Sequence, residues 1–264
     1  MGQVCELLEW DSQFFGVRVA RVVGDWLDQH RIAEIDEWCR AARVDCLYFL
    51  SRFDQFQTTR LAEGYGFQLV DVRVILVFER FSSGVKGNED VRGPNVSIRP
   101  ARDDDLPVLR EIAQRSYRHS RFYYDEHFRR NRCDELYAVW IEKCCHGRAD
   151  IVLVAEMADF TGPIGYVTCK LDRGYRLGEI DLVAVAEAAA GRGVGLCLID
   201  VAKQWFRDNE VARVMVATQG RNIAAQRLYQ RSGFLTHGVQ LWYHRWFEGE
   251  DSRTASSLGQ GTGA

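Results

Sequence analysis

One stretch of the chain decides the fold: Val183-Ala184-Val185-Ala186-Glu187-Ala188-Ala189-Ala190-Gly191-Arg192-Gly193-Val194-Gly195. An apolar strand pattern runs into a loop of small residues, and a helical pattern follows at once. Glycines at three alternate positions let the backbone turn tightly and approach a ligand closely. The first N–H groups of the following helix lack intrahelical partners and lie at the positive end of its dipole. The stretch therefore predicts a phosphate site, here for a pyrophosphate.

Two other phosphate-binding loops do not fit. The nucleoside-triphosphate loop needs Gly-Lys-Ser/Thr four residues after a glycine, and no lysine follows a glycine in that way. The dinucleotide fingerprint needs Gly-x-Gly-x-x-Gly, whereas this loop reads Gly-x-Gly-x-Gly, late in the chain. The loop instead resembles the coenzyme A loop of the GNAT acetyltransferases, Gln/Arg-x-x-Gly-x-Gly/Ala. Gly193 and Gly195 match that pattern, and Ala190 departs from it at the Gln/Arg position.

A second segment carries the rest of the GNAT order. Asn-x-x-Ala-x-x-x-Tyr runs from Asn222 to Tyr229, and Gly233-Phe234 follows. Asn222 suits a helix N-cap and Gly233 a helix end. Seven residues are about two helical turns, so Asn222 and Tyr229 share one face. A tyrosine on a helix is commonly a half-buried packing residue, but beside the glycine loop, at the family's spacing, we favour a functional role for Tyr229.

Composition limits the class of protein. The 264 residues are 47% apolar and 12% aromatic, which is enough to fill the cores of two globular domains. The net charge of −3 argues against a nucleic-acid polymer as partner, because such a surface needs clustered basic residues. No apolar run approaches 18 residues and no signal peptide is evident, so we expect a cytoplasmic protein that does not enter a membrane.

The eight cysteines predict reduced, packed thiols rather than a metal centre. None has Cys-x-x-Cys spacing, and the run Cys144-Cys145-His146 is too compressed to chelate one ion. Most fall inside apolar stretches, where cysteine behaves as a small hydrophobe. We therefore expect no metal.

Hydrophobic periodicity predicts an α/β protein with a mixed sheet. In the first half we expect strands around a turn at Asp11-Ser12, a helix over 31–43, a strand over 45–50, a helix over 55–63 and a strand from Gly66 to Phe78. In the second half the predicted order is β-α-α-β-β-β-α-β-α-β. Its later elements are strands at 150–156, 163–171, 177–186 and 211–218, a helix over 194–207, and strands near 234–237 and 239–247.

The end of the first half aligns with the end of the second. Gly66-Phe67 falls on Gly233-Phe234 at an offset of 167 residues, which also places Leu61 on Leu228. The same offset puts Gln55 where Asn222 stands and Ala62 where Tyr229 stands, and the first half has no Gly-x-Gly loop. We infer that the first half is a degenerate copy of the same unit, without the coenzyme site.

Four segments follow from this organisation. Residues 1–80 are the degenerate GNAT-like domain, residues 81–95 are a linker, residues 96–248 are the catalytic GNAT domain, and residues 249–264 are a disordered tail.

The resemblance to GNAT enzymes implies roles for these residues. The strand holding Val183 and Val185 would splay from its neighbour and pair with the pantetheine arm of acetyl-CoA, and its amides would also stabilise the oxyanion. The amides of Gly191, Arg192, Gly193, Val194, Gly195 and Leu196 would take the pyrophosphate, and Ala190 would belong to the same cofactor-binding loop. Asn222 would contact the arm, and Tyr229 would protonate the leaving thiolate. No cysteine stands at the expected site, so we expect direct transfer to an amine.

Glu179 and Asp181 are candidates for the base that neutralises the amine. They alternate on the strand with Val183, so we expect one face to carry all three. A solvated or ion-paired strand face explains the two carboxylates equally well.

A narrower resemblance concerns the substrate. The opening Leu-Glu-Trp-Asp-Ser-Gln-Phe-Phe-Gly, the segment Arg121-Phe122-Tyr123-Tyr124-Asp125 and the run Val216-Ala217-Thr218-Gln219 are similar to GNAT enzymes of nucleotide amino sugars. The resemblance implies acetylation of the 4-amino group of a dTDP-4-amino-4,6-dideoxyhexose for a surface polysaccharide. The aromatic residues could stack on thymine, with Arg118 or Arg121 on the diphosphate; a core cluster is the equal alternative.

Other functions stay open at this point. One is acetylation of another amine, such as a protein N-terminus, a polyamine or an antibiotic. Another is a non-catalytic acyl-CoA-binding sensor, against which the retained Asn222 and Tyr229 argue. The strand 239–247 is more aromatic than an exposed edge should be, which favours a homodimer.

Overall fold

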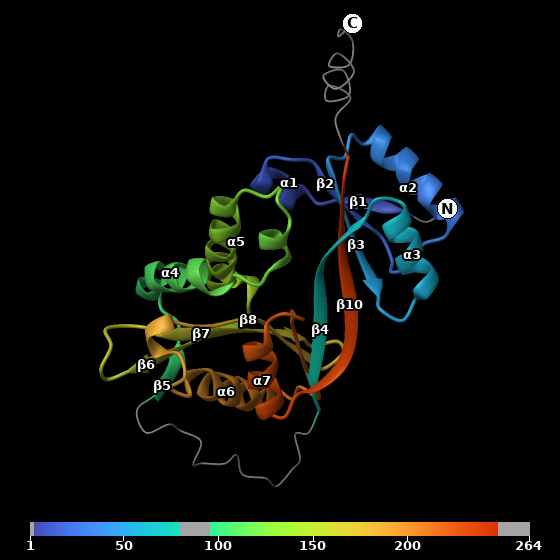
Figure 1. Cartoon of the computed structure of the whole chain (residues 1–264). Coiled ribbons are helices and arrows are strands. Elements are labelled where there is room, and N and C mark those ends of the chain that lie inside the picture. Colours follow the sequence, from blue (N-terminus) through green and yellow to red (C-terminus); the bar gives the residue numbers. More distant parts are fainter. Residues whose placement is uncertain (1–2, 80–95, 248–264) are drawn as a thin grey trace, which may run out of the picture. The chain divides into compact units, whose positions relative to one another are not determined.

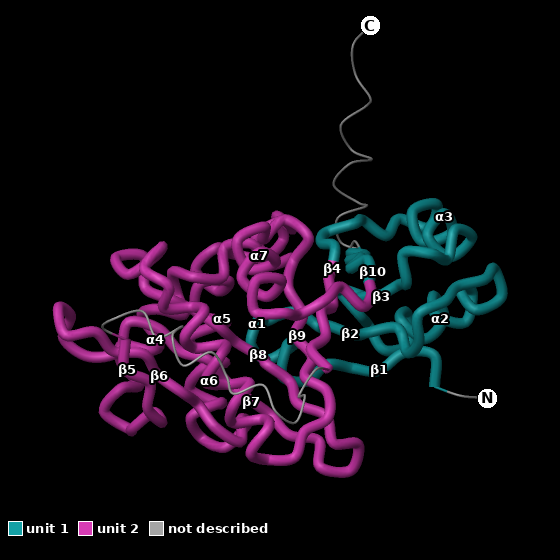
Figure 2. Tube along the Cα trace, turned by 90° about the horizontal axis from the view of Figure 1, so that it is seen from below, with its two compact units in different colours: residues 1–72, 239–264 teal, residues 73–238 magenta. Residues whose placement is uncertain are grey.

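A computed structural model describes residues 3–79 and 96–247. The predicted linker over 81–95 and the predicted tail over 249–264 lie outside these residues. The described chain forms two compact units, one of Met1–Val72 with Val239–Ala264 and the other of Arg73–Gly238 (Figure 2). The chain passes from one unit to the other inside two strands, β4 and β10.

The larger unit has the element order that the sequence predicts for the second half (Figure 1). Its elements are β5 (Val96–Pro100), α4 (Leu106–Ser116), α5 (Arg130–Lys143), β6 (Ile151–Met157), β7 (Gly165–Asp172), β8 (Leu177–Val185), α6 (Val194–Asp208), β9 (Arg213–Gln219) and α7 (Ile223–Arg231). Within this unit the strand order is β4-β9-β8-β7-β6-β5. Only β8 and β9 are parallel, so the sheet is mixed, as predicted.

Two layers of helices cover this sheet. The helices α6 and α7 pack on one face, where Leu198 and Phe206 join a core with Ile180 and Val216 of the strands. The α6 helix approaches β8 so closely that a Cβ on Gly178 would lie 2.5 Å from the Phe206 ring. Figure 1 shows α4 and α5 on the other side of β7 and β8.

The smaller unit has a core of its own. It contains β1 (Cys5–Leu7), α1 (Glu9–Phe15), β2 (Val19–Val22), α2 (Gln29–Ala41), β3 (Cys46–Arg52), α3 (Phe56–Gly64) and the first part of β4 (Gln68–Phe78). The predicted turn at Asp11-Ser12 is wrong, because Ser12 lies inside α1. Its hydroxyl donates to the Leu8 carbonyl and accepts from the Val19 N–H, which folds the short helix back onto the strand.

The offset of 167 residues relates the two halves element by element. It carries β3 onto β9 and α3 onto α7 without a change of length, and it carries β4 onto β10 (Leu235–Trp246) with one residue more. The two strands predicted near 234–237 and 239–247 are this single strand β10. The predicted internal repeat thus agrees with the elements that the chain forms.

The two repeats exchange their final strands. β4 pairs antiparallel with β9 from Arg73–Gln219 to Phe78–Val214, and β10 pairs antiparallel with β3 from Gln240–Arg52 to Trp246–Cys46. The second register is the first one shifted by the same offset. This exchange explains why the compact units divide at residues 72 and 238, whereas the sequence places the division at the linker.

The strand exchange also removes the argument for a homodimer. β10 is hydrogen-bonded to β3 and is therefore not an exposed edge, and Tyr243 is only 1% exposed in the core of the smaller unit. The aromatic residues of this strand are explained by packing inside the chain. A homodimer stays a prediction without that support.

Two further observations concern the cysteines and the helices. All eight cysteines are free thiols, and seven of them are buried. Among the helices of residues 3–79 and 96–247, none has both the length and the apolar character needed to cross a bilayer.

Candidate functional site

The sheet opens between β8 and β9, where their parallel ladder stops. Pairing runs from Leu177–Arg213 to Ile180–Val216 and goes no further, although β8 continues to Val185 and β9 to Gln219. Beyond Val216, β9 stays extended because β4 pairs with its other edge. The predicted splay of the two strands is therefore present.

A β-bulge coincides with the end of this ladder. On its other edge β8 pairs with β7, and the register moves from Cys169–Ile180 to Val167–Val183. Asp181 and Leu182 therefore oppose the single residue Thr168. Such a bulge bends the strand and can end pairing with a neighbour, which is what happens on the β9 side.

The backbone direction after the bulge fits the roles predicted for Val183 and Val185. The Leu182 N–H donates to the Thr168 hydroxyl at 2.9 Å, and the Ala186 N–H donates to the Ile164 carbonyl at 2.7 Å, both toward β7. Because successive N–H groups of a strand alternate in direction, those of Val183 and Val185 point the other way. They face the side on which β9 has diverged.

The glycine loop has the conformation that its sequence requires. Gly191 and Gly193 have φ of 77° and 81°, in the left-handed region, and Gly193 is the N-cap of α6. A Cβ at either position would meet nothing within 4 Å, so the backbone here is open to a ligand. Gly195 has another reason to be glycine, because a Cβ there would lie 3.3 Å from Leu228 of α7.

The side chain of Arg192, the charged residue of the loop, is engaged by two neighbouring residues. Arg192 forms an ion pair with Asp159 at 2.7 Å and lies over the Phe160 ring. Its hydrogen bond to Asp159 lowers the pKa of that carboxyl. Ala190 was predicted to belong to the same site, but its N–H donates to the Glu187 carbonyl at 3.0 Å. The N–H groups of Arg192, Val194 and Leu196 stay candidates for binding the pyrophosphate.

Tyr229 is buried in the core of the larger unit rather than exposed on the helix surface. Its ring is 5% exposed, with the Phe234 ring 5.9 Å away, and burial raises the pKa of its hydroxyl well above the usual value. Tyr117 lies near enough for a charge on Tyr229 to raise the pKa of the Tyr117 hydroxyl. At neutral pH Tyr229 is therefore a protonated, desolvated donor.

Asn222 performs the structural part of its predicted role. Its side-chain oxygen accepts the Ala225 N–H at 3.1 Å and so caps α7. The cap positions the helix that carries Tyr229. The amide nitrogen of Asn222 is the part of the side chain that suits contact with a ligand.

The bulge separates the two candidate bases from Val183, so the expectation of one shared face is wrong. Asp181 faces α5, whereas Val183 and Val185 pack against the core that includes α6. A continuous two-residue alternation would have kept Asp181 and Val183 together. The additional residue in β8 inverts that relation.

The two carboxylates have different surroundings. Asp181 accepts hydrogen bonds from Lys170 Nζ at 2.5 Å and Trp140 Nε1 at 3.0 Å, and Arg148 Nε lies 3.8 Å away. Glu179 is exposed to solvent. Glu179 is therefore better suited to accept a proton, and Asp181 to hold neighbouring structure.

The aromatic segment divides into core and surface. Phe122 and Phe128 are buried edge-to-face at 5.2 Å, and the buried Asp125 accepts from the backbone N–H of His127. The Tyr123 hydroxyl donates to Asp134 at 2.5 Å, which also binds Arg118. Tyr124 differs from these residues because it is 51% exposed. Of the predicted stacking residues, Tyr124 has the most accessible ring.

Two arginines that no local sequence signal identified lie near the aromatic segment: Arg221 near Tyr124 and Arg73 near Arg121. Arg221 lies over the Tyr124 ring, with its Cζ 3.5 Å from the centroid. Arg73 pairs with Gln219 across β4 and β9, and burial lowers its pKa, an effect that Arg121 increases and Glu179 opposes. The strand register would have been needed to bring Arg73 to this place.

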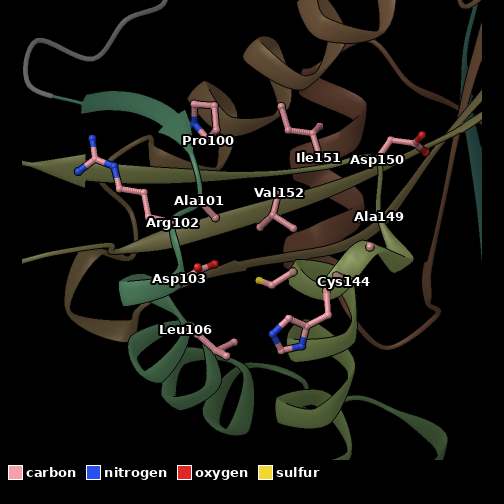
Figure 3. Close-up of a pocket in the computed structure, with 13 residues that line it drawn as sticks. Pro100, Ala101, Arg102, Asp103, Leu106, Cys144, Ala149, Asp150, Ile151 and Val152 are labelled. Carbon is pink, nitrogen blue, oxygen red and sulfur yellow. The ribbon is translucent and has the colours of Figure 1, made fainter.

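A separate pocket of about 280 Å³ lies elsewhere in the larger unit. Figure 3 shows its wall formed by Pro100, Arg102 and Asp103 on one side and by Cys144, Ala149 and Val152 on the other. None of its lining residues belongs to β8, the glycine loop or α7.

The comparisons with known proteins agree with this geometry. Residues 106–234 match the acetyltransferase (GNAT) family. Residues 106–234 are therefore a GNAT acetyltransferase domain. The fold predicted from the glycine loop and from the Asn222–Tyr229 segment is confirmed.

Two curated relatives and one solved structure narrow the comparison. The chain is 28% identical to the dTDP-fucosamine acetyltransferase of Escherichia coli over 247 residues, 91% of this chain and 97% of that protein. It is 28% identical to the spore coat polysaccharide biosynthesis protein SpsD of Bacillus subtilis over 157 residues, 60% of this chain and 53% of that protein. A tandem GNAT protein from the clavulanic acid biosynthesis pathway has a TM-score of 0.59 at 14% identity, covering 89% of this chain and 77% of that one.

The glycine loop generates a first prediction. Gly193→Ala places a side chain at a left-handed position, which costs about 1 kcal/mol of stability, and it adds a methyl group where phosphate would approach. We expect acetyl-CoA affinity to fall about tenfold, equivalent to about 1.4 kcal/mol, by isothermal titration calorimetry. Gly66→Ala is the matched control, because Gly66 has a φ of 80° and open space around it in the smaller unit. Equal affinities of the two variants would contradict the role of Gly193.

Proposed function

We propose that this acetyltransferase moves the acetyl group of acetyl-CoA directly to the 4-amino group of a dTDP-4-amino-4,6-dideoxyhexose. The proposed transfer rests on one observation: the edge of β8 is released from β9, and its residues Val183 and Val185 pack against the core that contains the buried Tyr229. The acceptor rests on the similarity to a dTDP-fucosamine acetyltransferase along 91% of the chain.

The residues of the larger unit fit acetyl-CoA. The open backbone at Gly191 and Gly193, followed by the N-terminus of α6, suits the pyrophosphate. The N–H groups of Val183 and Val185 suit the carbonyls of the pantetheine arm. Acetyl-CoA supplies an activated acetyl group, and the protein orients its carbonyl against these donors.

Two groups act on the developing charges. A β8 N–H stabilises the negative charge on the carbonyl oxygen, an effect commonly worth about 3 kcal/mol when the donor is fixed in advance. The Tyr229 hydroxyl gives its proton to the departing thiolate. Because burial keeps Tyr229 protonated, the donor is available throughout the neutral pH range.

The attacking amine has to be neutral. Glu179 accepts its proton directly or through water, since its carboxylate is exposed and Asp181 is engaged by Lys170 and Trp140. A sugar amine is less basic than the amine of lysine, so a strong base is not required.

The nucleotide part of the acceptor suits the residues around Tyr124. The exposed Tyr124 ring offers a stacking surface for thymine, although Arg221 already covers one face of it. Arg221, Arg121 and Arg73 supply positive charge for a diphosphate, which arginine binds with paired hydrogen bonds. Such a cluster favours an anionic acceptor over a polyamine.

Thiol release tests the proposal. Full-length protein is incubated with acetyl-CoA and dTDP-linked sugars that carry the amine at C4, at C3 or not at all. We expect release with the 4-amino-4,6-dideoxyhexoses alone, since the amine must reach the carbonyl while the nucleotide is bound. The same sugars without dTDP are the control. Release only with polyamines, antibiotics or protein N-termini would replace the acceptor that we propose.

A second prediction concerns Tyr229. Tyr229→Phe keeps the ring in the core and removes the proton donor. We expect kcat to fall about 100-fold or more, while acetyl-CoA affinity by calorimetry stays close to that of the wild type. An unchanged kcat under conditions where chemistry limits turnover would remove Tyr229 from the mechanism.

A third prediction concerns Arg221. Arg221→Ala removes a charged donor and we expect KM for the nucleotide sugar to rise about tenfold, the effect of about 1.4 kcal/mol, with little change in acetyl-CoA affinity. Arg227→Ala is the matched control, because Arg227 is an exposed arginine of α7. Equal changes in KM for both variants would exclude a specific contact with the acceptor.

A further inference from the structure

The bulge in β8 is held in place by side chains that the transfer mechanism does not use. It lies directly after Ile180, where the ladder with β9 ends, and directly before Val183. Its two residues, Asp181 and Leu182, are each bound by groups from neighbouring elements. The opening of the sheet therefore has an identifiable support.

Thr168 holds Leu182, one of the two residues of the bulge. The residue is fully buried in the middle of β7, an unusual place for a hydroxyl. Its Oγ1 accepts the Leu182 N–H at 2.9 Å, because the bulge leaves no carbonyl opposite that group. The same hydroxyl opposes the increase that burial causes in the pKa of the Cys144 thiol, in the turn that follows α5.

Asp181, the other residue of the bulge, is held through its own side chain. Its side chain is 11% exposed and accepts from Lys170 of β7 and Trp140 of α5, with Arg148 close by. These contacts attach Asp181 to β7 on one side and to α5 on the other. The bulge is consequently fixed before any ligand binds.

We propose that Thr168 is a positioning residue for the coenzyme: its hydroxyl holds the β8 bulge, which directs the N–H groups of Val183 and Val185 toward acetyl-CoA. Asp181 is the second anchor of the same bulge. The inference rests on the proposed function only in taking acetyl-CoA as the ligand, and it does not depend on the acceptor.

The Thr168 hydroxyl fixes the register of β8 against β7. Without the hydroxyl, the Leu182 N–H is buried without an acceptor, which proteins avoid. The regular alternative moves β8 by one residue against β7, and such a slip reverses the direction of every following side chain and N–H group. The N–H groups of Val183 and Val185 would then turn toward β7 and away from the coenzyme.

Thr168→Val tests this directly, because valine has the shape of threonine and lacks the hydroxyl. We expect the Kd for acetyl-CoA, measured by calorimetry on the full chain without acceptor, to rise about tenfold. Thr168→Ser is the matched control, since it keeps the hydroxyl, and we expect a Kd near that of the wild type. In the free protein, amide NMR signals of Val183 and Val185 should move in the valine variant and stay in place in the serine variant.

The following results would support or overturn the positioning role of Thr168. A lower melting temperature of Thr168→Val with unchanged Kd and unmoved Val183 and Val185 amides would show a role in stability alone and overturn the inference. If the valine variant does not fold, Asp181→Asn gives the second measurement, and a Kd equal to the wild type there would also overturn it. Loss of acetyl-CoA binding in Thr168→Val, with no dTDP sugar acetylated by the wild type, would support the positioning role and reject the proposed acceptor.

Discussion

The pairing of β4 with β9 is the interaction on which the coenzyme site depends. A strand that leaves its neighbour exposes a row of unpaired backbone groups, which is costly unless another partner is present. From Val214 to Gln219, β9 has that partner in β4. β8 can therefore diverge after Ile180 while β9 remains straight. The divergence leaves the N–H groups of Val183 and Val185 on the side from which β9 has moved away, and both residues pack against the core that contains Tyr229.

Because the final strands are exchanged, the degenerate half contributes β4 to the sheet that contains the proposed coenzyme site. The first repeat supplies β4, and the pairing of β3 with β10 is the equivalent ladder in the smaller unit. In that unit α2 connects parallel strands as α6 does, but Asp28 caps its N-terminus by accepting the Arg31 N–H at 2.7 Å. A carboxylate at this place repels phosphate, whereas Gly193 leaves the N-terminus of α6 open. This contrast favours a single coenzyme site per chain.

The sequence predicted those parts of the site that depend on the backbone and on residues close in the chain. The glycine loop, the cap at Asn222 and the order of elements follow from backbone freedom, capping and periodicity, and the repeat could be aligned from Gly66-Phe67 alone. The bulge could not be predicted, because it depends on a hydroxyl fourteen residues away that accepts one N–H in the folded sheet. Strand exchange and the stacking of Arg221 on Tyr124 likewise arise only from tertiary pairing.

The bulge also bears on which of the two candidate carboxylates we propose as the base. Glu179 and Asp181 are separated by one residue of the same strand and look equivalent in the sequence. Asp181 lies at the bulge and accepts hydrogen bonds from Lys170 and Trp140. Glu179 precedes the bulge, with its carboxylate in solvent. If Asp181 were the base, each turnover would have to protonate the group that holds the oxyanion donors in place; with Glu179 as the base, proton transfer and positioning stay separate.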